Sequence, residues 1–211
     1  MIGVVAHTAR AEAAHRLMET VGAAYMSIDD GTLGCEKNHH KTWTWLAEHN
    51  RDEWCVVLED DAIPVPQFTT QLASALDAAP ASIVSLYLGR KRPPHWQNAI
   101  DTATHNADQA DACWITAPQL IHAVAVAIKT SLIPGMLELT GRSIRPWDYA
   151  IGEYAQRNNE PVLYTWPSLF EHADQPTVAK HRDREHRHPG RTAWKTGTRT
   201  IWNNTSVNML P

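Results

Sequence analysis

The sequence of 211 residues has no long hydrophobic run and only three cysteines. No apolar stretch approaches the roughly 20 residues that a membrane-spanning helix requires, so we expect no transmembrane segment. The first residues, MIGVVAHTAR, show no basic region followed by a long apolar stretch, and we therefore expect no secretory signal. Cys35, Cys55 and Cys113 are widely spaced and lack the spacing of a zinc site. They predict reduced thiols in a cytoplasmic protein.

Internal repeats are also absent, and the only low-complexity segment is the His/Arg-rich stretch 181–191. Hydrophobic residues make up 43% and charged residues 20%, a composition typical of a globular protein. The net charge of −4 hides an asymmetry: residues 1–174 contain 12 Lys+Arg and 21 Asp+Glu, whereas residues 175–211 contain 7 and 2. We predict one domain over residues 1–174 and a basic tail over residues 175–211. The tail either contacts an anionic partner or folds back onto its own acidic body.

Alternating apolar segments predict an α/β fold. Up to residue 88 we expect strands at 2–6, 23–28, 54–58 and 82–88, and helices at 11–21, 35–49 and 68–78. Beyond residue 89 the pattern predicts a loop at 97–110, a strand at 112–116, helices at 119–129 and 147–157, and a strand at 162–166. After His172 we expect little regular structure. The alternation indicates an α/β sheet with a parallel part.

Two of the expected strands end in acidic residues, Asp29-Asp30 and Glu59-Asp60-Asp61. Ligands bind at the carboxyl ends of the strands in such a sheet. The alternation of side chains along a strand predicts that Glu59 and Asp61 point together toward one cation, with Asp60 on the other side. Carboxylate oxygens with open positions suit Mg²⁺ or Mn²⁺ shared with substrate phosphates. The alternative is an acidic turn that caps the next helix or lies in water.

The helix expected at 35–49 places Asn38 and His39 on the face that carries Cys35, Thr42 and Leu46. Polar side chains on a buried face need hydrogen-bond partners. The alternative for both residues is that they are satisfied polar groups of the core.

The pattern Gly34-Cys-x2-Asn38-His39-x3-Trp43, followed by Val56-Val-Leu-Glu-Asp-Asp-Ala62, resembles glycosyltransferase family 25. This family comprises the lipooligosaccharide and procollagen-type sugar transferases. Weaker similarities are Trp114-Ile-Thr-Ala117, Pro146-Trp-Asp148 and Pro167-Ser-Leu-Phe-Glu-His172, so that the resemblance covers about residues 2–174. Asn38 stands where the family usually has Ser.

The resemblance implies a GT-A-like fold, with a Rossmann-type central mixed sheet flanked by helices. This fold would bind a nucleotide-sugar, expected as a UDP-sugar, with a divalent metal ion on the diphosphate. Glu59–Asp61 would take the role of the family's DxD motif. Asp61 would be the first metal ligand, Glu59 the next and His172 a further one, although His172 is alternatively a surface histidine. Asp60 would contact the ribose or the donor sugar.

The loop after the first strand, with His7, Thr8 and Arg10, would bind the nucleotide, and Arg10 is alternatively a plain cation at a helix start. Asp29 and Asp30 would hold uracil or ribose hydroxyls, and His39 is placed with these donor-binding residues.

An inverting transfer needs a carboxylate that takes the proton of the acceptor hydroxyl. We expect Asp148 to be that base and Glu153 to be the reserve candidate. Asp148 lies in the first turn of its helix, where the helix dipole favours a charged carboxylate, and it alternatively only caps that helix. The aromatic residues expected to line a cleft are Trp96, Trp147 and Trp166, with Tyr149 also beside the base.

The acceptor is left open as a glycan, a protein or a hydroxymethylated base in DNA. The tail and the loop Arg90-Lys91-Arg92 combine cations with aromatic residues and would suit a phosphate backbone. With a glycan or protein acceptor, the tail would instead close over the donor. A metal-dependent nuclease is an alternative, because Asn38-His39-His40 superficially resembles an HNH pattern, although these residues are expected in a helix. A further alternative is a binding module that kept the fold and lost catalysis. The presence of Glu59, Asp61 and Asp148 argues against it, because such a module need not keep them.

Overall fold

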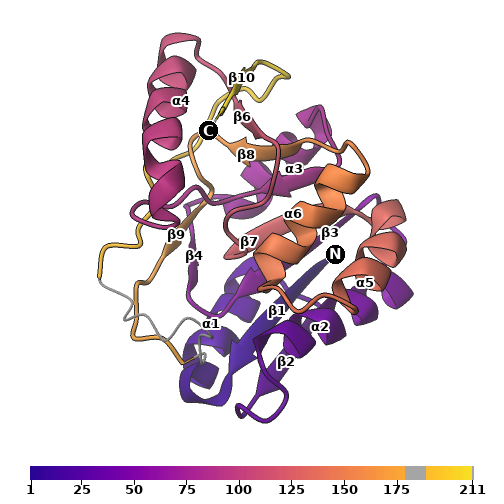
Figure 1. The fold of residues 1–211 in the computed structure, drawn as a ribbon. Coiled ribbons are helices and arrows are strands. Elements are labelled where there is room, and N and C mark those ends of the chain that lie inside the picture. The colour runs from indigo at the N-terminus through magenta and orange to yellow at the C-terminus, as the bar shows by residue number, and fades with distance from the viewer. Residues whose placement is uncertain (179–188, 211) are drawn as a thin grey trace.

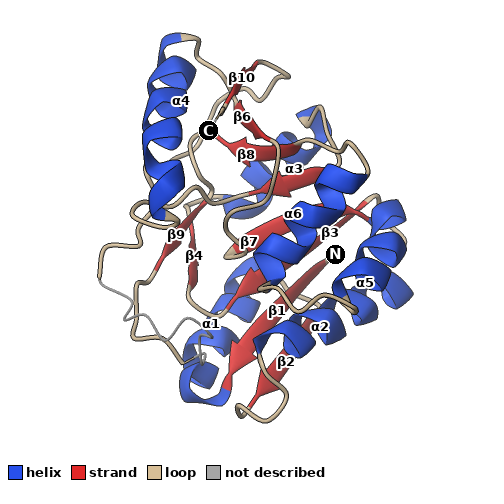
Figure 2. Ribbon diagram, in the orientation of Figure 1, coloured by secondary structure: helices blue, strands red, loops and turns tan. Residues whose placement is uncertain are grey.

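The computed structural model describes residues 1–178 and 189–210, which form an eight-stranded mixed sheet with helices on both faces (Figures 1 and 2). In spatial order the strands are β10 (Ser206–Asn208), β6 (Trp114–Ala117), β8 (Val162–Thr165), β5 (Ile83–Ser85), β7 (Ala125–Lys129), β3 (Trp54–Glu59), β1 (Ile2–His7) and β2 (Tyr25–Asp29). The predicted fold class, an α/β fold with a central mixed sheet flanked by helices, is confirmed.

The order of the first three strands creates the position where a ligand is expected. β1 lies between β2 and β3 and is parallel to both. The chain therefore moves outward from β1 to β2 through α1 (Ala11–Val21) and returns to the other side of β1 through α2 (Cys35–His49). Open α/β sheets bind ligands outside the carboxyl ends of the strands at such a reversal.

The two faces of the sheet are covered by different helices (Figure 1). One face packs against α2, α4 (Gln97–Gln109), α5 (Ile133–Thr140) and α6 (Trp147–Arg157), and the other against α1 and α3 (Phe68–Ala78). The 3₁₀ helices are η1 (Thr8–Arg10), η2 (Pro94–Trp96) and η3 (Thr130–Leu132). Neighbouring residues of β1 alternate between the faces: Val4 belongs to one core cluster and Val5 to the other. The central strands are therefore apolar at consecutive positions.

A second, two-stranded sheet joins the acidic turn to the end of the domain. It consists of β4 (Ala62–Pro64) and β9 (Phe170–His172), which pair antiparallel. Ala62 lies opposite His172 in this pairing. Because Ala62 directly follows Asp61, the pairing brings His172 to the acidic turn, more than a hundred positions away in sequence.

Two predicted elements are wrong. Residues 97–110, expected as a loop, contain α4, whose Ile100, Ala103 and Ala107 form a buried stripe within an otherwise polar segment. Residues 119–129, expected as a helix, contain β7 in the middle of the sheet. A short apolar run that is buried on both faces has no period that separates a strand from a buried helix. The strand expected at 82–88 is also shorter, since β5 covers only Ile83–Ser85.

The segment that follows residue 188 contains little regular structure, as expected, but it packs on the body of the protein. β10 pairs with β6, and Trp202 and Met209 are buried in the two core clusters. The division of the chain at residue 174 into a domain and a tail stays a prediction. Most of the His/Arg-rich stretch 181–191 lies outside the described residues. In the part of the chain that the structure describes, no helix is both long and apolar enough to span a membrane.

Candidate active site

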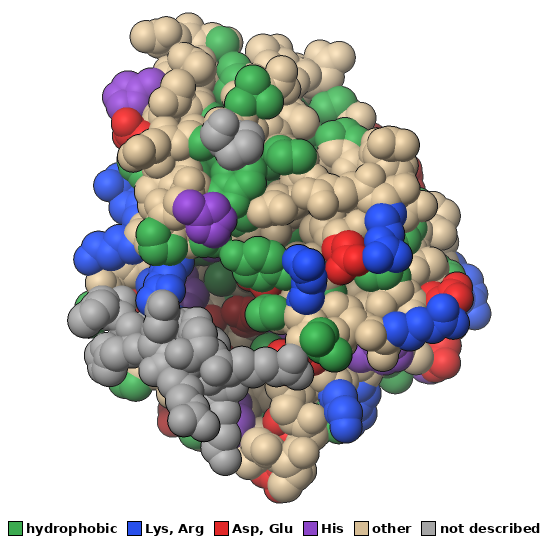
Figure 3. All heavy atoms as spheres, in the orientation of Figure 1, with side chains coloured by type: hydrophobic (Ala, Val, Ile, Leu, Met, Phe, Trp, Pro, Cys, Tyr) green, Lys and Arg blue, Asp and Glu red, His purple; other side chains and the backbone are tan. Residues whose placement is uncertain are grey.

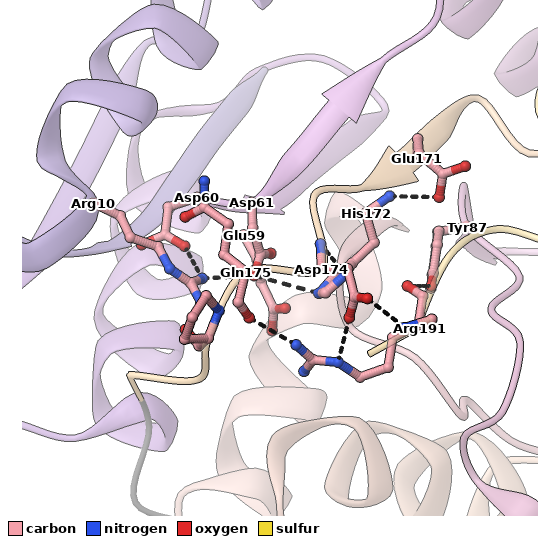
Figure 4. A network of polar contacts seen from close by, with 12 residues as sticks. Arg10, Glu59, Asp60, Asp61, Tyr87, Glu171, His172, Asp174, Gln175 and Arg191 are labelled. Carbon is pink, nitrogen blue, oxygen red and sulfur yellow. Dashed lines mark hydrogen bonds and ion pairs between the residues drawn. The ribbon is translucent and has the colours of Figure 1, made fainter. Parts of the chain in front are cut away.

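The acidic turn between β3 and β4 is bridged by Arg10. The Arg10 guanidinium donates through Nη1 to Asp60 Oδ1 at 2.8 Å and to Asp61 Oδ2 at 2.6 Å (Figure 4). The backbone N–H of His7 also donates to Asp60 Oδ2 at 2.8 Å. The loop after β1 and the loop after β3 are therefore tied together at the point where the strand order reverses.

The pairing of the three acids differs from the expected one. Asp60 and Asp61 share Arg10, whereas Glu59 Oε1 lies 3.3 Å from His39 Nε2. The three acids thus have different protein partners, and a cation shared by Glu59 and Asp61 stays a prediction. β3 ends at Glu59, and the next two residues belong to a turn in which the two-residue alternation of a strand no longer holds.

The neighbouring Asp60 and Asp61 have pKa values shifted in opposite directions. Burial raises the pKa of Asp60, and the charge of Asp61 adds to this effect. Burial also acts to raise the pKa of Asp61, but the hydrogen bond and charge of His172 and the charge of Arg10 outweigh it, and the pKa of Asp61 is lowered. Asp61 is therefore the more firmly ionised of the pair.

His172 is a hydrogen-bond donor to Asp61 in this arrangement. Its Nε2 lies 3.3 Å from Asp61 Oδ2, and its Nδ1 accepts the backbone N–H of Asp174 at 2.9 Å. Because Nδ1 accepts a hydrogen, Nε2 carries one. The network continues from Asp174 to Arg191, whose Nε lies 3.0 Å from Asp174 Oδ1 (Figure 4).

The acidic turn retains one carboxylate oxygen that suits a metal ion. Asp61 Oδ1 is buried and has no hydrogen-bond partner among residues 1–178 and 189–210. No three His, Cys, Asp or Glu side chains within these ranges gather as a metal-holding group, so Glu59, Asp61 and His172 do not form the expected ligand set as placed. Mg²⁺ is commonly held by one or two carboxylates together with substrate phosphates. The donor set therefore fits an ion shared with a ligand, held through Asp61.

A second group of side chains lies around Glu59, contributed by α2 and the start of α6. His39 is 1% exposed, and its ring stacks on Trp147 with centroids 5.4 Å apart and planes 16° apart. Trp147 is buried at the first position of α6 and is followed by Asp148. The face of the molecule drawn in Figure 3 shows acidic side chains recessed in a hollow between hydrophobic and basic ones.

Asp148 has the properties of a base that works near neutral pH. Burial raises the pKa of Asp148 to about 6, and the charge of Glu59 adds to this effect. The charge of His39 and the backbone N–H of Tyr149 act in the opposite direction, the latter donating to Asp148 Oδ1 at 2.8 Å. A carboxylate near its pKa at working pH accepts a proton readily and is ionised often enough to do so.

Glu153, the reserve base, is held by two arginines instead. Its Oε1 accepts from Arg157 Nη2 at 2.5 Å and its Oε2 lies 3.7 Å from Arg145 Nε. These ion pairs stabilise the charged carboxylate and occupy it.

The residues predicted to bind the nucleotide lie at the ends of β1 and β2. Asp29 accepts the backbone N–H groups of Leu33 and Gly34, each at 2.9 Å. It thereby closes the turn that leads into α2. Asp30 accepts from the hydroxyl and backbone N–H of Thr32. His7 caps η1 by accepting the N–H of Ala9 through Nδ1, and Thr8 is exposed beside it.

Other predicted residues have structural positions. Asn38 donates to the carbonyls of Ala6 and Ser27 and so joins β1 to β2 as a core polar group. The three tryptophans expected to line a cleft, Trp96, Trp147 and Trp166, are buried in the core. Asn38, His39 and His40 lie in α2, as expected, and not in the hairpin that an HNH nuclease requires.

Sequence reasoning missed Tyr87 and His122 near the acidic turn. The Tyr87 ring lies 6.1 Å from the ring of His172 and 5.3 Å from that of His122. Burial lowers the pKa of His122 to about 4, and its Nε2 lies 2.8 Å from the Arg92 carbonyl oxygen. Tyr87 follows β5 and His122 precedes β7, two elements that were predicted poorly, so that their positions could not be predicted from the sequence.

No family model and no curated protein matches this chain. It is similar to the crystal structure of A197 from STIV, with 10% identity, a TM-score of 0.48, and coverage of 95% of this chain and 97% of that chain. It is also similar to a glycosyltransferase involved in the glycosylation of the major capsid of PBCV-1, with 10% identity, a TM-score of 0.39, and coverage of 74% and 76%. At these values neither likeness carries functional weight, and membership of glycosyltransferase family 25 stays a prediction.

Proposed function

We propose that this protein is a glycosyltransferase of the hexosyltransferase type, which moves a sugar from a nucleoside-diphosphate sugar, UDP-linked by preference, to an acceptor hydroxyl with inversion. The observation that carries this proposal is the position of Asp148. A carboxylate with a pKa of about 6 stands beside Glu59 at the carboxyl edge of the sheet, where the strand order reverses. The sequence resemblance described above supports the same chemistry.

In the proposed reaction, the acceptor oxygen forms a bond to the anomeric carbon while the bond from that carbon to the diphosphate breaks with its electron pair. The acceptor proton passes to the Asp148 carboxylate. His39 holds Glu59 through Nε2 and supports Trp147 by stacking, so that both neighbours of the base are fixed in place. Trp147 is itself buried in the core and fixes the start of α6, where Asp148 is the next residue.

Asp61, with Glu59 next, would hold a divalent ion through the oxygen that has no protein partner. When bound, such an ion would neutralise the charge that develops on the leaving diphosphate. Arg10 keeps Asp60 and Asp61 together and thereby presents this oxygen, while His7, Thr8, Asp29 and Asp30 stand at the strand ends where the nucleoside would lie.

Nucleic-acid chemistry is supported less well. The Arg90 guanidinium lies 4.5 Å from the centre of the Trp194 ring, and Lys91 Nζ donates to the Pro189 carbonyl. These cations, expected to meet a phosphate backbone, are engaged by the C-terminal segment instead.

The proposal is tested by thermal shift with UDP, GDP and ADP, each with and without Mn²⁺. A nucleotide at a hundredfold excess over its Kd adds about 2.7 kcal/mol, which corresponds to an increase of roughly 5–10 °C in Tm for a chain of this size. We expect one nucleotide, most readily UDP, to do so with Mn²⁺, and Asp61→Asn to abolish the increase.

Asp77→Asn is the matched control, because Asp77 is exposed on α3, on the other face of the sheet. The proposal is rejected if no nucleotide stabilises the protein, or if the Asp61 and Asp77 variants respond alike.

A further inference from the structure

We propose that a polar cavity on α6 is the acceptor site and that the acceptor is a glycan; this inference rests on the proposed function. The cavity has a volume of about 300 Å³. It is lined by Gln119, Arg145, Tyr149, Glu153, Gln156 and Arg157. Five of these side chains come from α6 or the residues just before it, and Gln119 comes from the segment before β7.

The wall that carries Gln119 is held rigidly against α6. The Tyr164 hydroxyl, fully buried, donates to the Gln119 carbonyl at 3.2 Å and accepts the Ile121 N–H at 2.8 Å. Gly152 faces this segment closely: a Cβ there would lie 3.2 Å from Gln119 Cβ and from the backbone N and O of Leu120. The segment that carries Gln119 is therefore fixed by the buried Tyr164 hydroxyl and by its close packing on Gly152.

The position of the cavity suits an acceptor. Tyr149 lines it and directly follows Asp148, and the Tyr149 N–H donates to the Asp148 carboxylate. Consecutive helix residues point about 100° apart, so the cavity lies around α6 from Asp148, and an acceptor of more than one sugar would reach from the Tyr149 ring to the proposed base. Charged side chains of both signs cover α6 on the face seen in Figure 3.

The chemistry of the lining favours a sugar. Hydroxyl, amide, carboxylate and guanidinium groups offer both donors and acceptors around one aromatic ring, which matches the alternating hydroxyls and apolar face of a pyranose. Both arginines pair with Glu153, so that the cavity lacks the unpaired cations that a phosphate backbone requires.

Direct binding, without donor, tests the inference. The probes are methyl β-glucopyranoside, methyl β-galactopyranoside and methyl α-mannopyranoside, followed by saturation-transfer NMR and titration. We expect at least one of them to bind, and Gln119→Ala and Tyr149→Ala each to weaken it about tenfold. Gln109→Ala, the same change at an exposed position of α4, should bind as the wild type does.

Each variant is also melted with and without the stabilising nucleotide. If glycosides do not bind, or bind equally to all variants, while the nucleotide still stabilises the protein, the cavity inference fails alone. If no nucleotide stabilises the protein but glycoside binding depends on Gln119 and Tyr149, the proposed transfer fails and the cavity stands as a sugar site. If Tyr149→Ala loses both its nucleotide response and its thermal stability, the variant is misfolded and Tyr149→Phe is tested instead. Tyr149→Phe keeps the ring and should retain most of the glycoside binding.

Discussion

At the residue scale, the two ends of the candidate site hold carboxylates with opposite properties. His172 and Arg10 lower the pKa of Asp61 and keep it ionised, whereas burial and the charge of Glu59 raise the pKa of Asp148 to about 6. Environments that separate the pKa values of acids in one site are typical of a division between charge-holding and proton-transferring roles. Asp148 is therefore the acid whose removal should affect the chemical step.

Asp148→Asn should lower kcat about 100- to 10,000-fold, the usual contribution of a general base, and leave the nucleotide-dependent increase in Tm unchanged. In the wild type, kcat should rise with pH through about 6, because the base must lose its proton before it can accept one. Steady-state rates across this pH range measure both effects, with Asp77→Asn as the control. A variant that keeps the wild-type kcat, or a wild-type rate that falls as pH rises through this range, would rule Asp148 out as the base.

At the element scale, the sequence predicted the first three strands and the helices between them because their periodicities are clear. It failed where tertiary packing decides. Residues 119–129 form a mainly apolar run without a clear period. Part of this run is a strand, β7, because it pairs between β3 and β5 in the sheet. The same limit hid His122, which precedes β7. For the site, the acids at the strand ends were found from the sequence, but the partner of each acid depends on the turn after Glu59.

Gly152→Ala tests how closely the segment before β7 packs on α6. A helix interior gains about 1 kcal/mol from this change, but the new methyl group meets backbone atoms that Tyr164 holds in place, at a cost of about 1–3 kcal/mol. We expect a net loss in the free energy of unfolding, measured by urea denaturation.

Gly135→Ala on α5 is the matched control. The nearest neighbours of a Cβ there are side-chain atoms of Tyr154, at 3.3 Å or more, and none belongs to the backbone, so that this substitution should cost less than Gly152→Ala. Equal effects of the two substitutions would contradict the close packing inferred at Gly152.

At the scale of the whole molecule, the described part of the basic tail binds the acidic body. Arg191 pairs with Asp174, Lys195 with Asp108 at 2.7 Å, and Arg199 with Asp111 at 2.5 Å. The charge asymmetry of the sequence thus corresponds, in this part of the tail, to the alternative in which the tail folds back. Since surface ion pairs contribute little, the tail is held mainly by its buried side chains, by the hydrogen bonds of Arg199 and by the pairing of β10 with β6.

Trp202 is the main apolar anchor of this segment. It is 8% exposed, its ring centroid lies 5.4 Å from that of Trp114, and its Nε1 donates to Gln71 Oε1 at 3.0 Å. Trp202→Ala should lower the free energy of unfolding by about 3–5 kcal/mol, whereas Ile201→Ala, at a neighbouring side chain that is 70% exposed, should change it by less than about 0.5 kcal/mol.

Denaturation and amide hydrogen exchange of both variants decide whether the tail is part of the domain. If it is, Trp202→Ala should reduce protection in β1 and β3 as well as in β6, because β6 and β10 belong to the same sheet as the site. Protection lost only after residue 188, with β1 and β3 unchanged, would show that the tail detaches alone. The acidic turn would then keep its geometry without it, and the stability of the site would depend on residues 1–174 only.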